Sequence, residues 1–201
     1  MNWPPLLLFL TLPLAATALA QQGDDRAHAW AMRHYDQVLE AVLPTQAPLN
    51  VAAKDLKWGA RLRITPTFAP ESAYTLLKGF DAPVIATVTT LTGEPILTQL
   101  KGLYPQHRNA AAGKLSALIK RSTREVTVEQ CPALQDVAQG FEHLRIPVSL
   151  AGALQMDAAQ YELVSEGRSG TLRLSIAAPD PAPVVDWAER LRKSVAACTA
   201  R

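Results

Sequence analysis

Apolar residues recur at the spacing of an α-helix in several parts of the chain. In the first such segment, Tyr35, Val38, Leu39 and Val42 share one face, and Pro44 then ends the helix. In the last, Trp187, Leu191, Val195 and Cys198 form one stripe. The pattern predicts helices over 25–43, 96–103, 109–119, 132–144 and 184–198.

Other segments alternate apolar and polar residues, as half-buried strands do. Leu62 and Ile64 alternate with two arginines, and Pro66 ends this strand and favours an edge position because proline cannot donate a ladder hydrogen bond. Residues 84–91 are rich in β-branched side chains, which favours a central strand. Strands are predicted over 61–65, 84–91, 125–129, 158–165 and 171–177, and 71–80 fits either a helix or a strand.

Glycines at 167 and 170 lie between the last two strands, so these strands are expected to form a hairpin. Helices near both ends of the chain and several short strands predict an α+β fold with a mainly antiparallel sheet, on which the terminal helices pack. The helical periodicity disfavours a β-sandwich. We expect one globular domain over 21–201, which is long enough to bury a substantial core.

The chain begins with an apolar run, Leu6 to Ala20, that precedes a polar segment. Ala18 and Ala20 are the small residues that signal peptidase accepts, so residues 1–20 are predicted to be a signal peptide cleaved near Ala20. A membrane anchor is the alternative, but the run is short and Pro13 interrupts it. The residue directly after the cut is Gln21 and not a cysteine, which disfavours a lipid anchor, so we expect a periplasmic or secreted protein without a stable membrane anchor.

The two cysteines, Cys131 and Cys198, both lie in the predicted mature chain. An even number in an oxidising compartment predicts one structural disulfide. The stripe of the last helix directs Cys198 toward the core, which agrees with this pairing. A catalytic or redox pair is the alternative, but it usually has CxxC spacing or a nearby histidine, and neither is present.

Charge is balanced over the chain and uneven along it. The formal net charge is +2, with 19% charged residues. No acidic residue lies between Glu94 and Glu125, and that stretch holds Lys101, Arg108, Lys114, Lys120, Arg121 and Arg124. We expect these residues to form a basic patch for an anionic partner. Alternatively, they are solvated charges that pair with acids elsewhere. Nucleic acid is not the expected partner, because interleaved aromatic residues are missing.

Signatures of catalysis are sparse in this sequence. It contains no GxSxG, HExxH, CxxC or phosphate-binding glycine loop. His28 and His34 are six residues apart on the first helix, so a shared metal ion is not expected. We therefore assign no catalytic residue, metal or cofactor. Trp30 and Trp58 are expected to pack within the fold rather than to anchor a partner.

These features favour binding over catalysis. We expect an exported, soluble, non-enzymatic protein that acts on an envelope protein or an anionic cell-envelope component, as an inhibitor, immunity protein or accessory factor. The competing hypothesis is a small extracytoplasmic hydrolase whose triad is assembled from distant segments. A deep pocket with a serine or histidine beside an acid would favour the enzyme, and a protruding loop or flat basic face would favour binding.

Overall fold

The computed structural model describes residues 12–45, 55–145, 158–167, 170–177 and 183–199, with side chains described within these ranges from Gln22 to Cys198. These residues form five helices and one six-stranded sheet in which every neighbouring pair is antiparallel, so the α+β prediction is confirmed. The strands are β1 (Leu56–Thr65), β2 (Ser72–Gly79), β3 (Val84–Leu91), β4 (Arg121–Thr127), β5 (Gln160–Gly167) and β6 (Gly170–Ala177). Their order is β4-β3-β2-β1-β5-β6. The helices are α1 (Leu12–Val42), α2 (Ile96–His107), α3 (Ala112–Leu118), α4 (Ala133–Glu142) and α5 (Pro183–Thr199).

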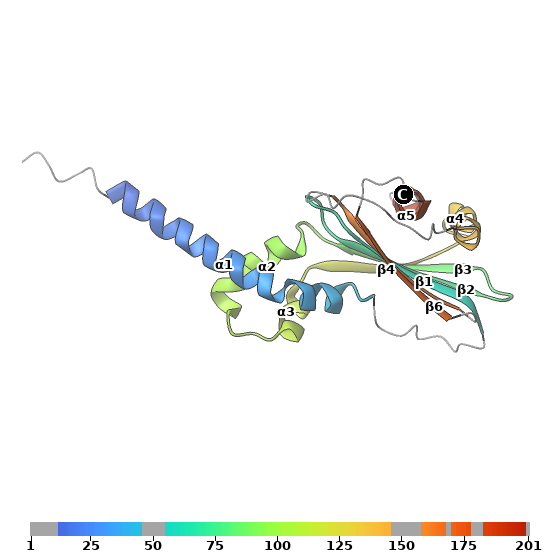
Figure 1. Ribbon diagram of the computed structural model, residues 1–201, viewed down its shortest axis with the longest axis horizontal. Coiled ribbons are helices and arrows are strands. Elements are labelled where there is room, and N and C mark those ends of the chain that lie inside the picture. The colour runs from blue at the N-terminus through green and yellow to red at the C-terminus, as the bar shows by residue number, and fades with distance from the viewer. Residues whose placement is uncertain (1–11, 46–54, 146–157, 168–169, 178–182, 200–201) are drawn as a thin grey trace, which may run out of the picture.

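One face of the sheet is covered by α4 and α5, and the larger core lies between these two layers (Figure 1). Successive strand residues point to opposite faces, so Leu62 and Ile64 enter this core while Arg63 points to the other face. Trp187 of α5 is fully buried, and its indole donates a hydrogen bond to the Val137 carbonyl of α4 at 3.0 Å.

A second core lies at one end of the sheet, where α2 and α3 pack on α1 (Figure 1). Val38, Leu39 and other residues of the predicted α1 stripe are buried there, next to Leu91 at the end of β3. Trp30 is 3% exposed and donates a hydrogen bond to the Arg108 carbonyl at 2.9 Å. Trp58 is buried in the larger core, so both tryptophans pack within the fold, as predicted.

The first helix is longer than predicted, because it begins at Leu12 and continues past Ala20 to Val42. Among the side chains that are described, burial on this helix begins at Ala27. Asp24 forms an ion pair with Lys101 of α2 at 3.8 Å. None of the described helices has the length and hydrophobicity that a bilayer-crossing segment needs.

The predicted disulfide is confirmed. Cys131, immediately before α4, is bonded to Cys198 in the last turn of α5, and their Cα atoms are 5.4 Å apart. Cys131 is fully buried in the larger core, and Cys198 packs against it. The bond therefore fixes the end of α5 to the start of α4.

Several strand predictions change in the folded chain. The edge position predicted from Pro66 is wrong: β1 pairs with β2 and β5 in the middle of the sheet, and Pro66 lies just beyond its ladder. The ambiguous segment 71–80 is strand β2. The predicted strand 125–129 is β4, which begins earlier, at Arg121. The start of β4 was missed because an exposed edge strand needs no apolar alternation.

Candidate functional site

A groove of about 490 Å³ lies between α5 and the loop that joins β1 to β2. Its size falls within the range of roughly 300–1,000 Å³ that is common for ligand sites. We call it the α5 groove. Its lining residues are Ile64, Pro66, Ala69, Pro70, Glu71, Ser72, Tyr74, Val88, Thr90, Leu91, Arg124, Ala159, Tyr161, Glu189, Arg192, Val195 and Ala196.

The floor of the α5 groove is apolar because it consists of strand residues that point toward α5. Ile64, Tyr74, Val88 and Tyr161 come from four neighbouring strands, and each is at most 5% exposed. Val195 of α5 contributes an apolar wall. An apolar side chain in this groove would therefore be removed from water on several sides, which is the main favourable contribution to most protein association.

A polar network closes the α5 side of the groove. The Tyr161 hydroxyl donates to Glu189 at 3.0 Å, and Arg192 donates to the same carboxylate at 2.6 Å. The hydrogen bond from Arg192, more than that from Tyr161, lowers the pKa of Glu189. Burial, with the hydrogen bond and charge of Glu189, raises the pKa of Tyr161 to about 12. At neutral pH these groups form a fixed phenol–carboxylate–guanidinium chain.

Arg124 brings a second cation to the α5 groove. It lies on β4 opposite Val88 of β3, so its side chain belongs to the face that α5 covers. Arg124 is exposed, and it makes no ion pair with the described part of the chain. Its guanidinium can therefore bind an acidic group of a ligand at the groove.

The loop beside the groove carries an exposed aromatic side chain that the sequence interpretation missed. Phe68 is 89% exposed, although Pro66, Ala69 and Pro70 around it all line the groove. Prolines restrict the backbone, so little conformational entropy is lost when such a loop binds a partner. The sequence signal that could have indicated this exposed aromatic residue is a phenylalanine in a turn between two prolines.

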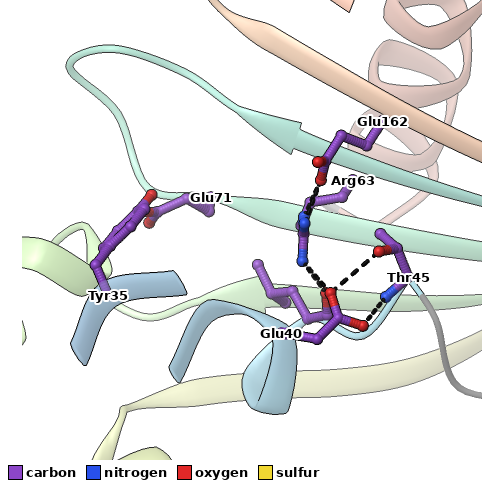
Figure 2. Close-up of polar contacts among 7 residues, drawn as sticks. Tyr35, Glu40, Thr45, Arg63, Glu71 and Glu162 are labelled. Carbon is purple, nitrogen blue, oxygen red and sulfur yellow. Dashed lines mark hydrogen bonds and ion pairs between the residues drawn. The ribbon is translucent and has the colours of Figure 1, made fainter. Parts of the chain in front are cut away.

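A separate polar cluster joins α1 to the opposite face of the sheet, as Figure 2 shows. Arg63 contacts Glu162 of β5 through two guanidinium nitrogens, and donates to Glu40 of α1 at 2.8 Å and to the Leu43 carbonyl at 3.0 Å. Glu40 also accepts hydrogen bonds from Thr45. The guanidinium is thus engaged in internal bonds, and we assign this cluster a structural role.

Glu71 makes the second polar connection between the helices and the sheet. It is 3% exposed, accepts from the Tyr35 hydroxyl at 2.9 Å (Figure 2), and accepts from the backbone N–H of Ile96 at 3.0 Å. The Ile96 N–H belongs to the first turn of α2, where backbone donors lack helical partners and a negative charge is favourable. Burial and then Glu71 raise the pKa of Tyr35 well above its usual range.

The predicted basic patch is spread over several elements. Lys101 and Arg108 belong to α2 and its end, Lys114 belongs to α3, and Lys120 precedes β4. Lys101 is paired with Asp24. Arg121 and Arg124 lie on β4, opposite Leu91 and Val88, so they point to different faces of the sheet. Binding by these six residues stays a prediction.

The α5 groove offers little for nucleophilic catalysis. One serine, the buried Ser72, lines the groove, but the described residues that line it include neither histidine nor cysteine. A serine nucleophile needs an adjacent base within hydrogen-bond reach. Among the described residues, no three histidine, cysteine or acidic side chains are grouped for a metal ion.

No family model matches this chain, and comparison with curated proteins and with solved structures gives no significant match.

Proposed function

We propose that this chain is a non-enzymatic binding protein that holds a segment of a protein partner in the α5 groove and against Phe68. The observation that carries the proposal is the exposed Phe68 on a proline-bounded loop next to an apolar groove. Binding energy in protein interfaces is concentrated in aromatic and arginine side chains. Phe68 and Arg124 provide one of each at this site.

The polar groups of the groove support binding rather than proton transfer. Tyr161 is protonated at neutral pH, with its pKa raised further from that range to about 12, and Glu189 is held by Tyr161 and Arg192. General bases work best when their pKa lies near the working pH. The groove thus presents hydrogen-bonded polar groups against which a partner can be oriented.

We further propose that the protein is exported and acts in the periplasm or outside the cell, after cleavage near Ala20. The disulfide supports an oxidising compartment. Cleavage at Ala20 would leave Asp24, Ala27 and the rest of the packed part of α1 in place. N-terminal sequencing of the protein from the producing cells should begin at Gln21, and a chain that still begins at Met1 would contradict export by this route.

The partner class that we propose is an envelope protein, which this chain would inhibit, protect or assist. Site-specific photo-crosslinking tests the site directly, with p-benzoylphenylalanine at position 68 and, as a control, at position 172 on β6. Leu172 is also exposed, at 43%, but it lies away from the α5 groove. Position 68 should give one cross-linked protein of defined mass, and position 172 should not.

Two results would count against this proposal. The same product from both positions would indicate non-specific contact. Labelling of a serine by a fluorophosphonate probe would instead favour the hydrolase hypothesis. Phe68→Ala provides the matched loss-of-contact variant, because removal of a side chain that is 89% exposed should change the unfolding free energy by no more than about 0.5 kcal/mol.

A further inference from the structure

The outer edge of β4 is exposed over its first five residues, whereas Thr127 at its end is bonded to Gln130 and Cys131 of the following turn. Among the described residues, β4 pairs with β3 alone and forms one end of the sheet. Its first five residues, 121–125, are all exposed. An edge strand presents a row of unpaired backbone N–H and C=O groups to which another extended chain can add.

Basic side chains lie on both faces of the sheet at this edge. Arg121 points to one face and Arg124 to the other, and Lys120 precedes them. Glu125 is the single acidic residue of the strand. None of the three cations forms an ion pair with the described residues. Opposite charges on neighbouring strands attract, and like charges directly opposite destabilise the pairing.

From this geometry we propose that the outer edge of β4 binds an extended acidic segment of a protein partner, which becomes a seventh strand of the sheet. Arg121 and Arg124 are three positions apart, and this spacing predicts how the acidic residues of the ligand are spaced. Two acidic residues three positions apart would lie on opposite faces of the added strand and meet both arginines. Two acidic residues two positions apart would share one face and could meet only one arginine.

A second copy of this chain is a poorer occupant than an acidic strand. Two β4 edges can pair antiparallel about Thr123, which places Arg121 of each copy opposite Glu125 of the other but leaves Arg124 opposite Ser122, without an acidic partner. Self-association of the chain at the concentrations used for binding would overturn the proposal.

The proposed strand would lie close to the α5 groove, because Arg124 belongs both to the edge and to the groove lining. The two surfaces could therefore be used by adjacent segments of one partner. This inference deepens the proposed function but has its own backbone and charge requirements, so the two can fail separately.

The test uses the full folded chain and three fluorescein-labelled ten-residue peptides of Val and Thr. The first contains two glutamates three positions apart, the second contains them two positions apart, and the third is the first peptide with N-methylated amides. Fluorescence anisotropy measures binding at low and physiological salt. The first peptide should bind at least about fivefold more tightly than the second, because it engages both arginines. The N-methylated peptide should not bind, because it cannot form the ladder.

The matched variants are R121E/R124E on β4 and R173E on β6, the opposite edge of the sheet. Arg173 is exposed and, like Arg121 and Arg124, forms no ion pair with the described residues. R121E/R124E should weaken binding of the first peptide by about tenfold or more, and R173E by less than about twofold. Thermal melts verify that both variants are folded. Phe68→Ala should leave peptide binding unchanged, which separates this edge from the Phe68 contact.

Amide hydrogen exchange locates the bound peptide. Exchange should slow within Arg121–Thr127 and stay unchanged within Gly170–Ala177. The proposal is overturned if the first peptide does not bind, if the N-methylated peptide binds equally well, or if R121E/R124E binds like the unsubstituted protein. Protection on β6 in place of β4 would overturn it as well.

Discussion

Arg63 and Glu71 are charged side chains that the fold buries, and their partners explain why. Arg63 is 7% exposed but is surrounded by two carboxylates and a backbone carbonyl, and Glu71 is 3% exposed but accepts from Tyr35 and from α2. A buried charge without such partners would be strongly destabilising. These residues therefore select one arrangement of the helices relative to the sheet.

Removal of the Arg63 charge should lower the unfolding free energy. In Arg63→Met the aliphatic stem is largely kept, but Glu40 and Glu162 lose their shared cation. Both carboxylates are about a third exposed, so we expect a loss of about 2 kcal/mol, less than for a fully buried pair. Urea unfolding measures this loss of unfolding free energy. Arg173→Met on the exposed strand β6 is the control and should change stability by less than about 0.5 kcal/mol; equal losses would contradict the assigned role.

The Tyr161 hydroxyl should make stability depend on alkaline pH. Its pKa in the folded protein is raised to about 12, from the ordinary value of 10.0. Between these values the unfolded chain releases the proton while the folded protein retains it, so this contribution is complete below pH 10 and is lost as the pH rises toward 12. Unfolding free energies at pH 9, 10 and 11 should fall less steeply for Tyr161→Phe. Parallel slopes would show that Tyr161 titrates normally.

At the scale of elements, the position of each strand follows from what borders it. β1 is central because both of its edges pair over nearly its whole length, and Arg63 on this strand is buried with partners in α1 and β5. β4 carries arginines too, but it has an open edge and its arginines stay exposed. Arginine therefore connects elements inside the fold on β1 and remains at the surface on β4.

Two glycines should respond in opposite directions to the same substitution. Gly93, between β3 and α2, has φ of 91°, while Gly102 lies inside α2, and neither has a neighbouring atom within 4 Å of an added Cβ. Gly93→Ala should cost about 1 kcal/mol because the left-handed conformation is strained for alanine. Gly102→Ala should stabilise by roughly 0.5–1 kcal/mol through helix propensity. Thermal unfolding compares the two, and a stabilising Gly93→Ala would refute the turn conformation.

At the scale of the whole molecule, two cores are joined by polar contacts and closed by a covalent bond. The larger core holds the sheet against α4 and α5, and the smaller one holds α1, α2 and α3 together. Arg63 and Glu71 connect the helical end to the sheet. The disulfide joins the end of the last helix to the start of α4, on the larger core.

Reduction of the disulfide should destabilise the whole fold. Its cysteines are 67 residues apart, and the chain-entropy model gives about 4 kcal/mol for a loop of that length. Denaturant unfolding of the oxidised and reduced protein measures the difference without any substitution. Cys131→Ala/Cys198→Ala is the control, since its stability should not respond to reductant. A difference below about 1 kcal/mol would show that the bond adds little to the packing of α5.

The hydrophobic pattern by itself determined the kind of each element except 71–80 and much of their extent, since helical and alternating periodicity report which face of a segment is buried. The even number of cysteines predicted the disulfide, and the stripe of the last helix, which directs Cys198 inward, agreed with it. Tertiary structure decided the strand order, the burial of Arg63, the α5 groove and the open edge of β4. Each of these depends on contacts between segments far apart in the chain, and antiparallel strands of similar composition can pair in many orders until such contacts select one.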